Sequence, residues 1–126
     1  MMEKSAWRVL VVEDEYDSIQ MVSKILHYHG IEVQVARNGQ ECLAFLGQFE
    51  PTLILTDLAM PTMDGWQTLK AIQSDPKTSH IPVIAVTAYH SLDVAREAAE
   101  AGFLACFSKP VDPRSFVQTL ADLVTA

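Results

Sequence analysis

Side chains able to do chemistry follow four short apolar segments of the sequence. They are, in chain order, Glu13 and Asp14, then Asp57, Thr87 and Lys109. Carboxylates held close together repel one another, so such a group must take up a proton or share a cation. Carboxylate oxygens suit Mg²⁺, and a carboxylate can also act as a nucleophile toward a phosphoryl group. The hydroxyl and the ammonium could then hold the phosphoryl oxygens.

These residues can act together only if the chain brings the ends of the apolar segments to one place. Five segments rich in β-branched residues occur at 9–12, 33–36, 53–56, 82–86 and 105–107. They lack polar alternation, which is typical of strands buried on both faces. Between them, apolar residues recur at helical spacing, as in Ile19, Val22 and Leu26, in Cys42, Leu46 and Phe49, in Trp66, Leu69 and Ile72, and in Phe116, Leu120 and Leu123.

Strands that alternate with helices predict an α/β fold with a doubly wound parallel sheet and helices on both faces. Ligands of such sheets bind beyond the carboxyl ends of the strands. Asn38 marks a helix start, Gly30 and Gly102 fall where helices should end, and Pro113 falls at the start of the last helix.

Each candidate residue also has a simpler explanation. Asp14 or Asp17 could cap the first helix, since an Asp at a strand-to-helix turn is more often a cap than a catalyst. Thr87 could be an ordinary strand residue, and Lys109 could be solvated. Their joint position on one edge of one sheet favours a functional site over these separate explanations.

Composition limits the classes of protein that fit. The 126 residues are 49% apolar with a net charge of −7, which predicts a single domain over residues 1–126 and argues against direct nucleic-acid binding. The apolar runs are too short to span a membrane and no signal peptide is evident. The two cysteines lack metal spacing, which fits a reducing, cytoplasmic setting.

Four segments together resemble one known family. VVEDE at 11–15, LILTDLAMPTMDG at 53–65, PVIAVTA at 82–88 and FSKP at 107–110 are similar to the signature segments of the receiver domain of two-component response regulators, the CheY-like family. The resemblance implies a five-stranded (βα)5 fold of the flavodoxin/CheY-like type, with strand order 2-1-3-4-5.

The resemblance also implies a metal site. Asp14, Asp57 and the backbone carbonyl of Ala59 would bind Mg²⁺ directly, and Mn²⁺ could take its place. Glu13 would act through a metal-bound water.

By the same resemblance, Asp57 would be the phosphoacceptor, supplied by a sensor histidine kinase or a histidine phosphotransfer protein. Thr87 and Lys109 would hold the phosphoryl oxygens, and the Lys109–Pro110 bond would be cis. Phosphorylation would draw Thr87 inward and shift the surface formed by the fourth helix, the fifth strand and the last helix.

One position departs from the family pattern. Cys106 stands where the family usually has the Tyr or Phe that moves with the threonine of the site. By strand alternation, Phe107 should point to the other side of the sheet and cannot replace it. Either Tyr89, two residues after Thr87, acts in its stead, or Cys106 only fills space and Tyr89 packs at the surface.

The main prediction is therefore a phosphorylation-switched signalling module and not a conventional enzyme, although it would promote its own aspartyl phosphorylation and dephosphorylation. A degenerate receiver that acts as a phosphorylation-independent interaction domain is the alternative. An aspartyl-phosphate phosphatase ranks third, because Ala59 occupies the place of its second Asp. A flavodoxin-like cofactor binder ranks lower still, since 13–18, EDEYDS, is too acidic to hold a phosphate.

The sequence predicts no output domain on this chain, so we expect a downstream protein or a missing output domain to receive the signal. A homodimer through the last two helices is a further expectation by resemblance.

Overall fold

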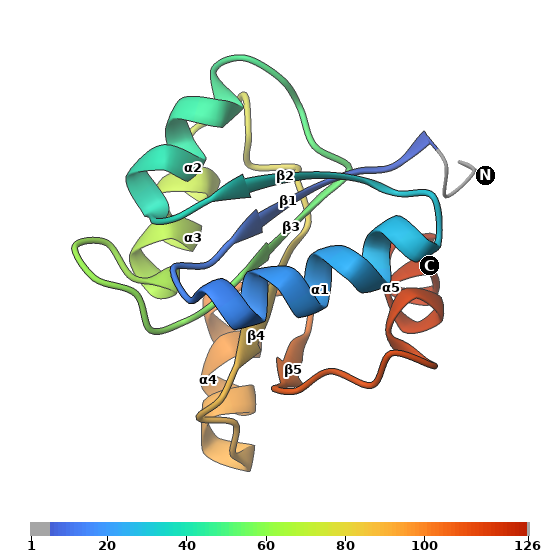
Figure 1. Cartoon of the computed structure of the whole chain (residues 1–126). Helices are drawn as coiled ribbons and strands as arrows, with labels where there is room; N and C mark the ends of the chain where they lie inside the picture. The colour runs from blue at the N-terminus through green and yellow to red at the C-terminus, as the bar shows by residue number, and fades with distance from the viewer. Residues whose placement is uncertain (1–5, 126) are drawn as a thin grey trace.

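Strands and helices alternate along the part of the chain that the structure, a computed structural model, describes, residues 6–125 (Figure 1). The strands are β1 (Arg8–Val12), β2 (Glu32–Ala36), β3 (Leu53–Thr56), β4 (Val83–Thr87) and β5 (Cys106–Ser108). The helices are α1 (Tyr16–Tyr28), α2 (Gly39–Leu46), α3 (Gly65–Ser74), α4 (Leu92–Ala101) and α5 (Phe116–Thr125).

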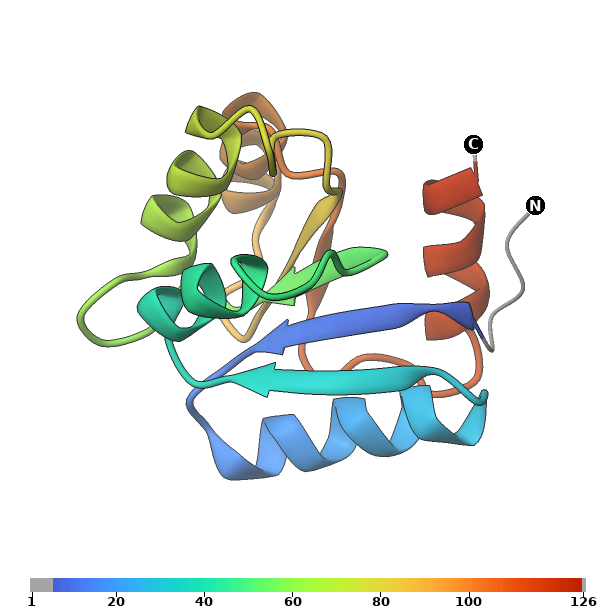
Figure 2. The same cartoon turned by 90° about the horizontal axis from the view of Figure 1, so that it is seen from above.

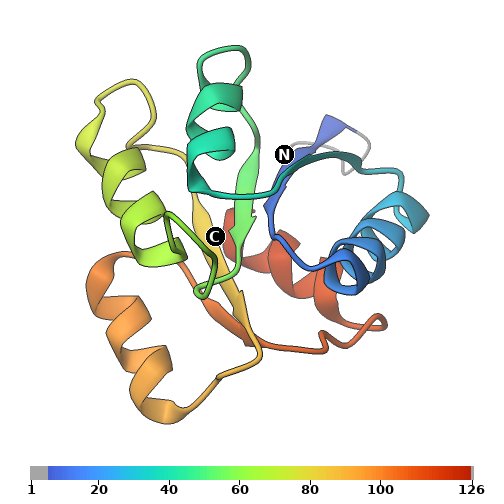
Figure 3. The ribbon, with the colours of Figure 1, turned by 60° about the vertical axis from the view of Figure 1, so that its left-hand side comes forward.

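The strands form one parallel sheet in the order β2-β1-β3-β4-β5, which confirms the predicted doubly wound fold. Helices α1 and α5 cover one face of this sheet, and α2, α3 and α4 cover the other (Figures 2 and 3). The strand order changes direction between β1 and β3, the place where such sheets bind ligands.

Both faces of the sheet are buried, as the continuous apolar strands predict. On one face, Val9 and Leu55 pack with Phe116 of α5 and with α1. On the other face, Leu10 and Ile54 pack against α2 and α3. The two layers of core hold the central strands rigidly, so the strand ends are fixed points for the side chains that follow them.

Several helix ends match the sequence signals. Asn38 caps α2, where its side-chain oxygen accepts a hydrogen bond from the backbone N–H of Glu41 at 2.9 Å. Gly102 ends α4 with a φ of 115°, and Gly30 follows α1 with a φ of 75°. Both glycines adopt the left-handed conformation that other residues rarely take.

Other boundaries differ from the prediction. Helix α2 ends at Leu46, so the inclusion of Phe49 in its apolar face was wrong. The chain turns at Gly47, and Phe49 instead lies under the guanidinium of Arg8, 4.3 Å from its ring centre. Pro113 lies in a turn that precedes α5 and is not its first residue. Within residues 6–125, no helix has the length and apolarity that a membrane crossing requires.

Candidate functional site

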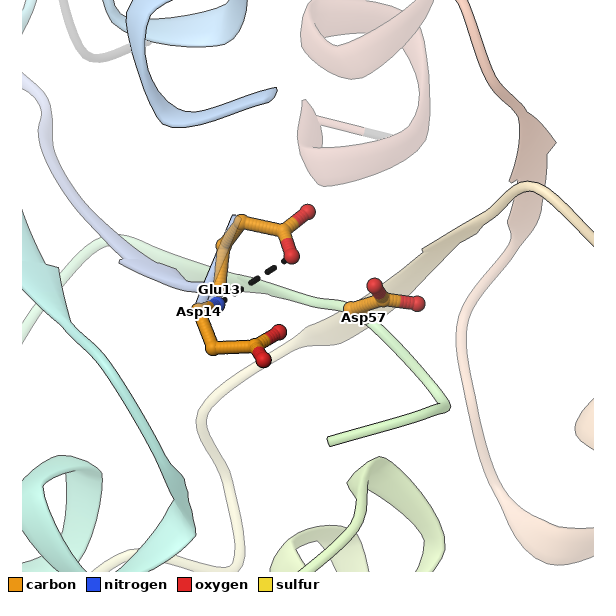
Figure 4. A group of neighbouring side chains, drawn as sticks. All are labelled: Glu13, Asp14 and Asp57. Atoms are coloured by element: carbon orange, nitrogen blue, oxygen red, sulfur yellow. Dashed lines mark hydrogen bonds between the residues drawn. The ribbon is translucent and has the colours of Figure 1, made fainter. Parts of the chain in front are cut away.

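The ends of β1 and β3 bring three acidic side chains together. Val12 and Thr56 are partners in the parallel ladder, so the residues that follow them leave the sheet at the same edge. The backbone N–H of Asp57 donates to the carbonyl of Val12 at 3.0 Å. Glu13, Asp14 and Asp57 each place a carboxylate oxygen within 4.8 Å of the others. Figure 4 shows these three side chains.

Glu13 is the buried member of this acidic group, with 4% of its surface exposed. Its carboxylate accepts hydrogen bonds from the backbone N–H groups of Asp14 and Glu15, at 3.2 and 3.3 Å. Burial raises the pKa of Glu13, the hydrogen bond from Lys109 partly opposes this, and the charge of Asp57 raises it further. The side chain is therefore held in one orientation while Asp14 remains exposed.

Lys109 links the fifth strand to the acidic group. Its ammonium donates to Oδ2 of Asp57 at 3.0 Å and also to Oε1 of Glu13. Burial alone would lower the pKa of Lys109, but its hydrogen bonds to these two carboxylates and their negative charges outweigh burial, so the pKa is raised. The ammonium therefore stays charged beside Asp57. The Lys109–Pro110 peptide bond is cis, which confirms that prediction.

Thr87 lies at the end of β4 with 1% of its surface exposed. Its hydroxyl accepts a hydrogen bond from the backbone N–H of Tyr89 at 3.1 Å. Its carbonyl accepts from the backbone N–H of Lys109 at 2.9 Å. Thr87 thus joins the loop after β4 to the start of the Lys109 segment.

The loop between β3 and α3 closes tightly around Asp57. The backbone N–H of Ala59 donates to Oδ1 of Asp57 at 3.3 Å. Asp64 caps α3 by accepting from the backbone N–H of Gln67 at 2.8 Å, and the side chain of Gln67 bonds back to the backbone of Asp64. A side chain on Gly65 would place its Cβ 2.2 Å from the carbonyl oxygen of Asp57, so only glycine fits there.

The alternative that Asp14 or Asp17 caps the first helix is wrong. The N-cap position of α1 is Glu15, whose side chain makes no cap hydrogen bond. Neither Asp14 nor Asp17 therefore caps this helix.

Cys106 and Phe107 are arranged as strand alternation predicted. Cys106 lies opposite Ala85 and belongs to the core on the α3 and α4 side. Phe107 lies on the other face, where its ring packs edge-to-face on Phe116 with centres 5.1 Å apart. Tyr89 is on the loop after β4, and 75% of its surface is exposed.

Two hollows are lined by Thr87 and by Lys109, respectively. One of about 580 Å³ lies between the loops that follow β3 and β4, and its lining includes Ala59, Thr87 and Tyr89. The other, of about 340 Å³, lies between the start of α1 and the segment after β5, and its lining includes Lys109 and Met21.

Two features of the site escaped the sequence analysis. The ion pair between Lys109 and Glu13 was missed, because Lys109 was considered either as a phosphate ligand or as a solvated side chain. The contact of Gly65 with the backbone of Asp57 was also missed, although the turn residues at 61–65 were a signal for a tight loop.

Comparison with known proteins now identifies the family. A sequence model described as the response regulator receiver domain matches residues 9–121. The chain belongs to the response regulator receiver family. Receiver domains are signalling modules, and the acidic group, Thr87 and Lys109 lie at the carboxyl edge of this receiver's sheet.

The chain matches individual relatives over most of the length of both proteins. The chain is 32% identical over 112 residues to the polar-differentiation response regulator DivK of Brucella anthropi, covering 89% of this chain and 91% of DivK. It is 36% identical over 110 residues to an uncharacterized 14.6 kDa protein of Leptolyngbya boryana, covering 87% and 84%. The solved structure of the chemotaxis response regulator CheY4 of Vibrio cholerae superimposes with a TM-score of 0.84 at 30% identity, covering 93% of this chain and 98% of CheY4.

Proposed function

We propose that this receiver accepts a phosphoryl group on Asp57 from a sensor histidine kinase or a histidine phosphotransfer protein. The observation that supports this most strongly is the position of Asp57, whose carboxylate meets the ammonium of Lys109 at 3.0 Å at the rim of the sheet. A nucleophilic carboxylate beside a fixed cation suits an incoming phosphoryl group, whose oxygens are negatively charged.

The donor set fits Mg²⁺. Three carboxylates within 4.8 Å of one another supply hard oxygen ligands, and the exposed Asp14 leaves space for water. We propose that Asp14, Asp57 and the carbonyl of Ala59 hold the ion and that Glu13 acts through a bound water; Mn²⁺ would fit the same ligands. When bound, the ion supplies positive charge that lets a phosphoryl group approach the carboxylates.

The reaction is a transfer between two nucleophiles. A carboxylate oxygen of Asp57 attacks phosphorus, the phosphorus–nitrogen bond of the phosphohistidine breaks, and the imidazole leaves with the electron pair and takes up a proton. The ammonium of Lys109 transfers its hydrogen bond from Asp57 to a phosphoryl oxygen, and the hydroxyl of Thr87 donates to another. Attack of water on the phosphorus of the acyl phosphate later breaks its bond to the carboxylate oxygen, which releases inorganic phosphate and returns Asp57 to its free form.

Signalling would use the surface formed by α4, β5 and α5. Among the residues of α4, only Ala98 is buried, so little packing fixes this helix. Leu92 and Leu104 are exposed there, by 87% and 44%. We propose that phosphorylation shifts the population of this surface between two arrangements, of which a downstream protein or an output domain binds one.

Four further expectations stay predictions. They are the single-domain organisation of residues 1–126, the action of the protein in the cytoplasm, the lack of direct contact with nucleic acid or membrane, and a homodimer.

The test is incubation with Mg²⁺ and acetyl phosphate, followed by intact mass. The matched variants are Asp57→Asn, which removes the nucleophile, and Asp17→Asn, which removes an exposed carboxylate in the first turn of α1. We expect a Mg²⁺-dependent gain of one phosphate in the wild type and in Asp17→Asn, and none in Asp57→Asn. No gain in the wild type, with no Mg²⁺ binding, would favour the degenerate interaction domain.

A further inference from the structure

The hollow between the loops after β3 and β4 lies beside an exposed aromatic ring. Its volume is about 580 Å³, and its walls include the apolar side chains of Leu58, Met60, Trp66 and Val94. Tyr89 stands at its edge with 75% of its surface exposed. An aromatic ring gains free energy on burial, so the ring and the hollow are complementary.

The fifth strand offers no ring to this side of the sheet. Cys106 lies on the same face of the sheet as the hollow, but its side chain is short. Burial also raises the pKa of its thiol, which keeps the thiol uncharged. Phe107 packs on Phe116 at the opposite face. Tyr89 is therefore the exposed ring that is in reach of the hollow.

A hydrogen bond connects Tyr89 to the phosphorylation site. Its backbone N–H donates to the hydroxyl oxygen of Thr87 at 3.1 Å, and the hydroxyl belongs to a side chain that is 1% exposed. Rotation of the Thr87 side chain toward a phosphoryl oxygen would carry its hydroxyl oxygen away from the N–H of Tyr89. Two residues further along, Ser91 fixes the chain again, because its side chain caps α4 by accepting from the backbone N–H of Val94 at 3.1 Å.

We propose that Tyr89 is a lid that closes into this hollow when Asp57 is phosphorylated. The proposal rests on the proposed function, because the phosphoryl group draws the Thr87 hydroxyl away from the N–H of Tyr89. The freed loop then seats the ring of Tyr89 against Trp66 and Val94. The carboxylate of Asp64 also lines the hollow and offers an acceptor for the phenol hydroxyl.

The direct test is the reactivity of Tyr89 toward tetranitromethane, which nitrates exposed tyrosines. Tyr28, 87% exposed at the far end of α1, is the internal reference. Samples with and without acetyl phosphate and Mg²⁺ are nitrated, and peptide mass spectrometry gives the rate at each tyrosine. We expect the rate at Tyr89 to fall several-fold relative to Tyr28 in the phosphorylated sample. An unchanged ratio in a sample that has gained phosphate overturns the lid.

The same samples separate the two possible failures. Intact mass reports whether phosphate is gained, so a failure of phosphorylation refutes the proposed function and the lid with it. A gain of phosphate with no protection of Tyr89 refutes the lid alone. In Thr87→Ala, the N–H of Tyr89 has lost its acceptor before phosphorylation, so the rate at Tyr89 should be the same with and without phosphate; a fall of the wild-type size on phosphorylation would refute the role of the Thr87 hydroxyl.

A second readout uses the tryptophan in the wall of the hollow. Trp66 lines it, whereas Trp7 is 1% exposed within the core on the α1 and α5 side. Phosphorylation should change the emission of Trp66 in the wild type and in Tyr89→Phe, which keeps the ring. The change should be lost in Tyr89→Ala, and a full change in that variant would contradict closure by Tyr89.

Discussion

Replacing Gly65 with Ala should damage both the stability and the chemistry of this receiver. The added Cβ would lie 2.2 Å from the carbonyl oxygen of Asp57 and 2.8 Å from Cα of Leu58. Both are backbone atoms, so a side-chain rotation cannot relieve the clash. Overpacking of this kind costs about 1–3 kcal/mol, against about 1 kcal/mol that Ala gains over Gly within a helix. We expect the free energy of unfolding to fall by up to about 2 kcal/mol.

Gly47→Ala is the matched control. A Cβ at Gly47 would meet only the carbonyl oxygen of Ala44 at 3.4 Å, and the residue has an ordinary φ of −75°. The same substitution should therefore leave stability unchanged or raise it by up to ~1 kcal/mol. Urea unfolding of the two variants compares their free energies of unfolding, provided that the free energy falls with urea concentration at the same slope in both.

The chemical effect is measured in the same two proteins. A forced movement of the Asp57 carbonyl displaces the phosphoacceptor, and a misplacement of about 1 Å can cost ~100-fold in rate. We expect phosphorylation of Gly65→Ala by acetyl phosphate to slow by about tenfold or more, with no change in Gly47→Ala. If Gly65→Ala keeps wild-type stability within ~0.5 kcal/mol and phosphorylates at the wild-type rate, the tight closure around Asp57 is wrong.

Three other predictions follow from single contacts. Replacing Lys109 with Met should lower the free energy of unfolding by about 3 kcal/mol at pH 7, because the buried charge of Glu13 loses its partner. That loss should shrink at pH 5, because the raised pKa of Glu13 in the folded state makes a larger fraction of it uncharged at pH 5 than at pH 7; an equal loss at both pH values in urea unfolding would count against it. Asp64→Ala should cost about 1 kcal/mol by removing the cap of α3, and no shift of the urea midpoint would show that the cap is dispensable. Burial raises the pKa of the Cys42 thiol to about 12, whereas Cys106 is only partly buried, so a thiol reagent at pH 8 should modify Cys106 slowly in the folded protein and Cys42 only after unfolding; early reaction of Cys42 would contradict its burial.

The sequence was sufficient to predict the architecture. Strands without polar alternation and helices with one apolar face left few topologies, and the structure has the expected order of elements. The same reasoning predicted that side chains after β1, β3 and β5 would converge, because the carboxyl ends of parallel strands share an edge. The opposite facing of Cys106 and Phe107 followed from strand alternation alone.

What the sequence could not supply were distances and competing partners. The residue types alone do not indicate that the ammonium of Lys109 pairs with both Glu13 and Asp57, because each carboxylate is an equally suitable partner when only the sequence is known. The exposure of Tyr89 depends on which way a short loop turns after β4, which no periodic pattern specifies. The end of α2 was misplaced because Phe49 continues the apolar spacing beyond Gly47.

The most direct test of the central proposal is the location of the phosphoryl group. After incubation with acetyl phosphate and Mg²⁺, sodium borohydride reduces an aspartyl phosphate to homoserine, and peptide mass spectrometry identifies the residue that was reduced. If Asp57 is the phosphoacceptor, homoserine should appear at position 57 and only when Mg²⁺ was present. Homoserine at another aspartate such as Asp14, or none in a protein that binds Mg²⁺, would contradict the assignment of Asp57.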